Sequence, residues 1–184
     1  MELLLFLQKK FKGRVSVERV VSGGGLENIF EFFCNKHPHL VNHSIVHEMN
    51  GDGEIKGQII SKYADLGDSL CQKTIALFVE AYGAEAGLTC LKFLPYGGLY
   101  LAGGLTPKII NHLRGPTSSF RRAMLDKGRL SSTVEYIPVL AVLREDLAER
   151  GCFMYAYYCF VHAHSSAFHR RHQNQIRFFP SNRH

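Results

Sequence analysis

The strongest fold signal in this chain is the stretch Gly97-Gly98-Leu99-Tyr100-Leu101-Ala102-Gly103-Gly104-Leu105-Thr106-Pro107-Lys108. Residues 99–102 form a short apolar run bounded by two glycine pairs, which predicts a buried β-strand. Thr106 followed by Pro107 predicts a helix start, with the threonine as N-cap and the proline as the first helical residue. A second buried strand is predicted over residues 137–143. Because helical segments separate the two strands, we expect an α/β domain with a mainly parallel sheet.

Helical segments surround this stretch on both sides. Asp68 is a good N-cap for a long helix that runs to about Phe93 and is ended by Pro95. Within it, Gly83 and Gly87 lie four residues apart, and each glycine costs about 1 kcal/mol relative to alanine in a helix interior. This cost predicts that another backbone passes close to their face. Shorter helices are predicted over residues 1–12, from Val15 with Ser16 as a candidate cap, from Leu26 to about Asn35, over residues 120–127, and from Asp146 to about Phe160.

Two internal segments carry turn or loop signals. The cluster Ser22-Gly23-Gly24-Gly25 is predicted to break the chain before the helix at Leu26. Residues 38–68 are polar and contain the turn Asn50-Gly51-Asp52-Gly53, so this is expected to be the least ordered internal stretch. Four histidines in and before it are interpreted as surface residues: His37, His39, His43 and His47.

Composition indicates one soluble globular domain. The chain has 184 residues, of which 46% are hydrophobic and 21% charged, which is typical of neither disordered nor fibrous proteins. The apolar run Leu3–Leu7 is far shorter than the roughly 18 residues of a membrane span. Acidic Glu2 precedes this run and basic residues follow it, the reverse of a secretory signal. We therefore expect neither a leader nor a membrane partner.

The spacing of the cysteines and the distribution of charge indicate the cellular compartment and exclude some kinds of partner. The five cysteines are scattered without CxxC spacing, which favours reduced thiols and a cytoplasmic location over a disulfide framework or a zinc site. Of the 22 lysines and arginines, four lie in residues 161–184, where there is no acidic residue, so residues 1–160 hold 18 basic and 16 acidic side chains. The body is nearly neutral, and no nucleic-acid partner is expected.

Three blocks, in the same order, resemble the bacterial-type glucokinase family. The first comprises residues 15–26 and Asn28, and is similar to the family pattern VSxER followed by SGxGLxN. The second comprises Tyr82-Gly83-Ala84-Glu85-Ala86-Gly87 and the stretch 97–108. The third ends in Asp126-Lys127-Gly128-Arg129 and is followed by Ile137-Pro138-Val139. One block would be a weak signal, whereas three in order make a specific match.

The resemblance implies a partial actin-like, hexokinase-like ATPase domain of the α/β class with ribonuclease H-like topology, mainly its C-terminal lobe. It implies a sugar kinase segment that, in the complete enzyme, transfers phosphate from ATP with Mg²⁺ to glucose, giving glucose 6-phosphate at the start of glycolysis. Residues 1–160 would form the glucokinase-like region, and residues 161–184 a basic, histidine-rich, disordered tail. The alternative is a truncated, non-catalytic glucokinase-like protein with an interaction role or no role.

The resemblance also implies three binding residues. Glu18 matches a position whose carboxylate accepts hydrogen bonds from sugar hydroxyls, and its two oxygens suit a vicinal diol. By spacing alone, Glu18 would be an exposed glutamate in the first turn of a helix. Gly103 and Gly104 match the adenosine-binding element, where no Cβ separates the backbone from a nucleoside beside a helix start. In isolation, this pair would be a tight strand-to-helix turn.

No catalytic residue is assigned, because several family motifs are absent from this sequence. They are the Asp-x-Gly-Gly-Thr and Gly-Thr-Gly-Leu-Gly phosphate motifs, the Asn-Asp pair that supplies the catalytic aspartate, and the Glu-Gly-Gly-His sugar motif, which the family carries upstream of the position of Met1. Leu88 also stands where the family usually has asparagine. The chain alone is therefore expected to lack the catalytic base.

The histidine- and arginine-rich tail matches nothing in the family. An unstructured or aberrantly encoded extension, a metal site involving His164 and His169, and weak contact with nucleic acid are the interpretations weighed, and the first is preferred. No metal ligand is assigned, because the histidine spacing fits no recurring motif. Glucose and ATP are the expected partners, and a homodimer stays an open alternative.

Overall fold

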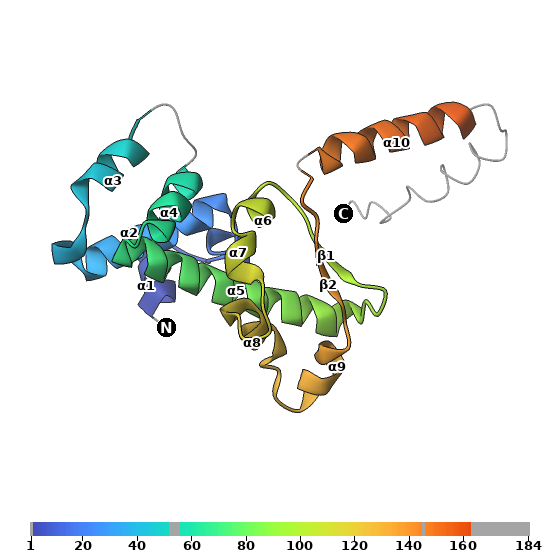
Figure 1. Cartoon of the computed structure of the whole chain (residues 1–184), viewed down its shortest axis with the longest axis horizontal. Helices are drawn as coiled ribbons and strands as arrows, with labels where there is room; N and C mark the ends of the chain where they lie inside the picture. Colours follow the sequence, from blue (N-terminus) through green and yellow to red (C-terminus); the bar gives the residue numbers. More distant parts are fainter. Residues whose placement is uncertain (1, 52–55, 145, 163–184) are drawn as a thin grey trace, which may run out of the picture. The chain divides into compact units, whose positions relative to one another are not determined.

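The computed structural model describes residues 2–51, 56–144 and 146–162, and the chain divides into two compact units, 1–143 and 144–184. Figure 1 shows the elements in chain order. The first unit contains α1 (Glu2–Phe11), η1 (Val17–Arg19), α2 (Gly23–Lys36), η2 (Pro38–Leu40), α3 (His43–Met49), α4 (Lys56–Asp65), α5 (Ser69–Phe93), β1 (Leu99–Leu101), α6 (Leu105–Lys108), α7 (Ile110–Leu113), α8 (Ser119–Leu125), η3 (Gly128–Leu130), α9 (Ser131–Glu135) and β2 (Val139–Ala141). The second contains α10 (Leu147–His162).

The core of the first unit is built around α5, whose start and end confirm the sequence prediction. The Asp68 carboxylate accepts hydrogen bonds from the backbone N–H groups of Leu70 and Cys71, at 3.1 and 2.9 Å. The helix ends at Phe93, two residues before Pro95. By length and composition α5 would suffice for a membrane span, but 44% of its most apolar window is buried in the fold. Packing in the core accounts for that composition.

Helix α8 packs across α5 (Figure 1). The contact is made at the two interior glycines of α5. A Cβ on Gly83 would lie 2.8 Å from the carbonyl carbon of Phe120 and would overlap its oxygen. A Cβ on Gly87 would overlap the carbonyl oxygen of Met124. Real Cβ contacts are never this short, so the crossing requires glycine at both positions. The predicted close approach of a second backbone is confirmed.

The sheet within the described residues consists of β1 and β2, paired in parallel with Leu99 opposite Val139. This confirms the predicted α/β class and parallel pairing. The prediction of two buried strands is wrong in part, because Tyr100 and its register partner Leu140 are 63% and 42% exposed. Alternate side chains of a strand point to opposite faces. Leu101 therefore points into the core, whereas Tyr100 and Leu140 share the uncovered face.

The described residues of this segment, 38–51 and 56–68, differ from the prediction of a poorly ordered stretch. Asp52 and Gly53 of the predicted turn lie outside the described residues. The two described ranges contain α3 and α4, and three of their side chains, Ile45, Ile59 and Ile60, are fully buried. Helix α4 packs against α2 and α5, and Gly57 of α4 lies close to Leu26 of α2. The polar composition gave a wrong prediction because only one face of each helix packs against the core. A few apolar residues on that face are enough to hold the helix in place.

Three predicted helix starts are also corrected. Ser22-Gly23-Gly24-Gly25 does not break the chain, because Ser22 is the N-cap of α2 and the glycines form its first turn. The segment after Val15 is a single 3-10 turn, η1, and the side chain of Ser16 makes no capping hydrogen bond. Gly104 rather than Thr106 is the N-cap of α6, which begins at Leu105. Besides α5, the predicted helices that are confirmed to within three residues at both ends are α1, α2, α8 and α10.

The burial of the cysteines leads to a labelling prediction. All five thiols are free; Cys71 is fully buried, and this burial, with the nearby Asp68 carboxylate, raises the pKa of its thiol. Cys152 in α10 is exposed. Because only the thiolate reacts with iodoacetamide, we expect Cys152 to be alkylated at least ~100-fold faster than Cys71 at pH 8. Peptide mass spectrometry over time would measure both rates, and equal rates would contradict the buried position of Cys71.

Candidate functional site

Gly103 and Gly104 lie beyond the carboxyl end of β1, where they line a pocket of about 220 Å³. Ser22 and Gly23, at the start of α2, line the same pocket. The turn after a strand of the sheet is therefore brought together with a helix start that lies some eighty residues earlier in the chain. Both glycines that the sequence singled out contribute to one concave surface.

The two glycines differ in what their backbone requires. Gly103 has φ of +102°, a conformation that side-chain-bearing residues rarely adopt, so the turn itself accounts for glycine there. Gly104 has φ of −66° and ψ of −13°, which any residue can adopt. A Cβ built on Gly104 would meet no atom within 4 Å. Neither backbone conformation nor packing within the described structure explains glycine at position 104.

The polar lining of this pocket comes from hydroxyl groups and a helix start. The Tyr82 hydroxyl and Thr106 Oγ1 lie 3.3 Å apart on the pocket wall, and Thr106 is almost fully buried. At the start of α2, Ser22 Oγ accepts a hydrogen bond from the Gly25 N–H at 2.9 Å. The first N–H groups of a helix have no partner within it, and its dipole makes this end positive. The pocket can therefore receive polar or anionic ligand atoms.

Glu18 is placed outside the pocket but is connected to it. It lies in η1 with an exposed side chain, and within the described part of the chain its carboxylate has no hydrogen bond or ion pair. Its backbone carbonyl accepts a hydrogen bond of 2.7 Å from the hydroxyl of Ser22, a pocket residue. Glu18 does not line the pocket with Gly103 and Gly104. Ser22 connects Glu18 to the pocket, because it lines the pocket and donates a hydrogen bond to the Glu18 carbonyl.

Most of the pocket wall is not evident from the sequence. Ser22 and Gly23 form a helix start rather than the predicted break, and Tyr82 belongs to a family motif without a predicted role at the site. The signal for Ser22 was available, because serine directly before a helical stretch is a common N-cap. No local signal links Tyr82 to Thr106, since their contact is made only when α5 packs against the β1–α6 turn.

A larger hollow of about 330 Å³ lies along β1, β2, α7 and α8. Its lining is mostly apolar, with Leu101, Phe120 and Met124 among its residues, and it includes none of the three predicted site residues. We assign the candidate site to the smaller pocket, because its wall carries hydroxyls and helix N–H groups suited to a polar ligand.

Metal binding has no support in the described part of the chain, where no cluster of three or more histidine, cysteine or acidic side chains is found. The metal interpretation of the tail rested on His164 and His169. Both residues lie outside the described residues. Of the predicted disordered tail, residues 161–184, Val161 and His162 form the end of α10, and residues 163–184 lie outside the described residues.

A parallel strand that ends in a glycine turn against a helix start defines an α/β domain of the type that binds ligands at the carboxyl ends of its strands. The sequence model of the glucokinase family, described as Glucokinase, matches residues 1–158. This chain therefore belongs to the glucokinase family, as its three sequence blocks predicted.

Curated relatives and a solved structure agree with this family assignment. The chain is 42% identical over 153 residues to a glucokinase of Synechocystis, covering 77% of this chain and 42% of that protein. It is 39% identical over 166 residues to a glucokinase of Nostoc punctiforme, covering 84% and 48%. The crystal structure of a glucokinase from an Antarctic psychrotroph superposes with a TM-score of 0.61 at 26% identity, covering 79% and 41%. The chain thus spans less than half the length of these relatives.

Proposed function

We propose that this chain is the C-terminal part of a glucokinase and that the complete protein transfers the terminal phosphate of ATP to glucose, giving glucose 6-phosphate. In this proposal Glu18 accepts hydrogen bonds from sugar hydroxyls, and Gly103 and Gly104 lie against the adenosine. Family membership supports the reaction class. The observation that carries the role of the two glycines is the pocket that they share with the start of α2, whereas the role of Glu18 rests on the family resemblance.

The residues of this pocket fit a nucleotide. Gly104 leaves open space where a Cβ would stand, which the approach of a planar ligand would use. The start of α2 offers N–H groups to a polar or phosphate oxygen. No carboxylate lines the pocket within the described residues, so we assign no residue of this chain to Mg²⁺. Bound ATP would supply the transferable phosphate, and the metal would neutralise its charge.

Glu18 contributes positioning of the sugar. An exposed carboxylate without a partner keeps both oxygens available, and two adjacent hydroxyls of a pyranose can donate to them. Holding the attacking sugar in one orientation lowers the entropic cost of the transfer. We assign no base within this chain, because no residue matches the family's catalytic aspartate.

We further infer a glucokinase-like region over residues 1–160 followed by a separate tail, and the family match over residues 1–158 supports that boundary. A cytoplasmic location is proposed from the free thiols and from glucose as the substrate. Glucose and ATP are the proposed partners, while a homodimer stays a hypothesis to be tested by ultracentrifugation.

The direct test is a coupled assay of glucose phosphorylation. We expect the purified 184-residue chain to show no glucose-dependent ATP consumption above background, because it lacks the base and the family's phosphate motifs. Joined to the N-terminal half of the Synechocystis glucokinase, it should become active, and Glu18→Ala should reduce that activity at least ~10-fold. Robust turnover by the chain alone would overturn the need for another segment. Inactivity of a folded, joined protein would favour the non-catalytic alternative.

A further inference from the structure

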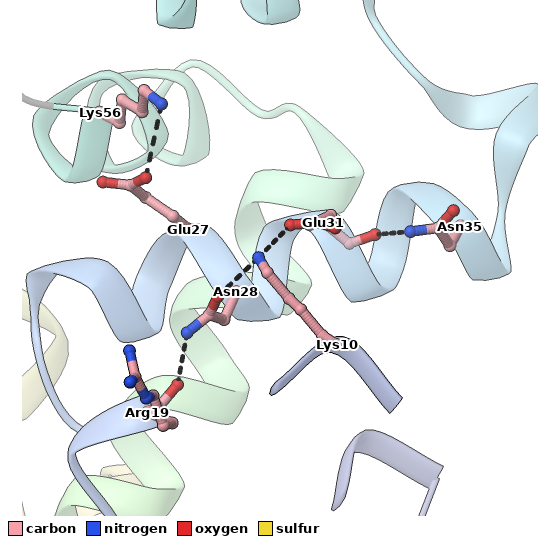
Figure 2. A network of polar contacts seen from close by, with 7 residues as sticks. All are labelled: Lys10, Arg19, Glu27, Asn28, Glu31, Asn35 and Lys56. Carbon is pink, nitrogen blue, oxygen red and sulfur yellow. Dashed lines mark hydrogen bonds and ion pairs between the residues drawn. The ribbon is translucent and has the colours of Figure 1, made fainter. Parts of the chain in front are cut away.

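Asn28 is a buried amide in the middle of α2, and both ends of its side chain are hydrogen-bonded (Figure 2). It is 7% exposed. Its Nδ2 group donates to the backbone carbonyl of Arg19 at 2.9 Å, and its Oδ1 atom accepts from Lys10 Nζ at 2.8 Å. Arg19 directly follows Glu18 in η1. The buried amide therefore ties the turn that carries Glu18 to the interior of a long helix.

The chemistry of the two partners sets the orientation of this amide. A lysine ammonium can only donate and a backbone carbonyl can only accept, so Oδ1 must face Lys10 and Nδ2 must face Arg19. Lys10 is in turn paired with Glu31, one turn further along α2 (Figure 2). Neither a carboxylate nor an aliphatic side chain at position 28 could satisfy both partners.

A second hydrogen bond, from the N-cap of α2, holds the preceding residue of the turn. Ser22 Oγ donates to the carbonyl of Glu18 itself at 2.7 Å. The two successive carbonyls of η1 are thus both fixed by side chains of, or next to, one helix. Gly25 allows the close approach that this needs, because a Cβ there would overlap the carbonyl of Val20.

These contacts leave the Glu18 backbone fixed while its carboxylate is free. The turn is only three residues long, and within the described residues the Glu18 side chain has no partner that could orient it. Its position must then come from the backbone, and the backbone is held by Asn28 and Ser22. A short turn anchored only by its own hydrogen bonds would fray readily.

We propose that Asn28 is a positioning residue for Glu18: by holding the Arg19 carbonyl from inside the fold, it sets where the sugar-binding carboxylate lies. This inference rests on the proposed function of Glu18. The competing interpretation is a purely structural link, in which Asn28 only joins α1, η1 and α2. The positioning role and the purely structural role make different predictions. If Asn28 positions Glu18, a substitution at Asn28 weakens glucose binding only while the Glu18 carboxylate is present.

The anchoring itself is tested on the 184-residue chain by hydrogen exchange. Asn28→Asp keeps the acceptor for Lys10 but replaces the donor to Arg19 by an oxygen that repels its carbonyl. We expect the Val20 and Val21 amides, which donate to Val17 at 2.9 and 2.8 Å, to exchange at least ~10-fold faster, with the amides of α5 unchanged. Asn35→Ala is the control on the same helix, since Asn35 is exposed and its side chain donates to the Glu31 carbonyl rather than to the η1 turn. Unchanged exchange in Asn28→Asp would overturn the proposal.

The action through Glu18 is tested by a double-mutant cycle on glucose affinity in the chain joined to the Synechocystis N-terminal half. We expect Asn28→Asp alone to weaken glucose binding at least ~5-fold and leave ATP binding unchanged, but to have no further effect when Glu18→Gln is present. Additive losses would overturn the inference, as would an unchanged glucose affinity in Asn28→Asp while Glu18→Gln weakens it. If Glu18→Gln itself has no effect, the proposed function fails and the inference with it. Should Asn28→Asp not fold, Asn28→Ala, which removes the donor to the Arg19 carbonyl without adding a charge, must give the same pattern.

Discussion

Gly83→Ala is expected to destabilise the first unit by about 3 kcal/mol, because the added methyl group would overlap a backbone carbonyl of the neighbouring helix. In an isolated helix, alanine would be more stable than glycine by about 1 kcal/mol. The expected loss of stability must therefore come from the contact between α5 and α8. The added Cβ would overlap the Phe120 carbonyl of α8, and a backbone group cannot rotate away as a side chain can. The two helices would have to separate, which exposes core surface between them.

Urea unfolding followed by circular dichroism measures this change, provided that the dependence of the free energy of unfolding on urea is unaltered. Gly24→Ala is the matched control, because it also adds one methyl group within a helix but meets only Ser22 Oγ, at 3.9 Å. It should change the free energy of unfolding by less than about 1 kcal/mol. Equal stability of Gly83→Ala and the natural protein would contradict the close crossing of α5 and α8.

Gly104→Val and Glu18→Gln are expected to separate the two proposed ligands in the chain joined to the Synechocystis N-terminal half. Valine at position 104 has room in the fold but would occupy the space proposed for adenosine, so ATP affinity should fall at least ~10-fold, about 1.4 kcal/mol, with glucose binding nearly unchanged. Glu18→Gln removes a charged acceptor from the sugar only. It should weaken glucose binding by a similar factor and spare ATP.

Calorimetric titration of both variants with both ligands checks this pattern. Gly97→Val is the control for the glycine substitution, because position 97 is equally open but lies at the other end of β1 and lines no described pocket. It should leave both affinities unchanged. Equal loss of both ligands in Gly104→Val and Glu18→Gln would mean that these residues support the fold rather than the ligands.

Local signals predicted the elements that depend on neighbouring residues. Asp68 caps α5 through its own side chain, and Pro95 cannot continue a helix, so both ends of α5 could be read from the chain. The glycines Gly83 and Gly87 could likewise be interpreted, because their cost in a helix demands a compensating contact. What could not be predicted was the partner, since α8 follows α5 by more than two dozen residues.

Local signals gave wrong predictions where a polar or glycine-rich segment was compatible with two structures. Ser22 followed by three glycines can break a chain or begin a helix, and the cap made by Ser22 and the packing of Gly25 against Val20 favour the second. The helices α3 and α4 were missed because three buried isoleucines, rather than a long apolar stripe, attach them to the core.

The sequence by itself determined the family and the α/β class, because the motifs of the glucokinase family are contiguous and need no knowledge of distant contacts. It also singled out Glu18, Gly103 and Gly104 as candidate binding residues. Only the tertiary structure decided how they are related: the two glycines share a pocket with the start of α2, whereas Glu18 lies outside it and is joined to it through Ser22. The physical reason is that the buried Asn28 amide and the Ser22 hydroxyl bond to carbonyl groups of another element of the chain. Such hydrogen bonds form only when the elements pack together, so the spacing of residues in the sequence does not predict them.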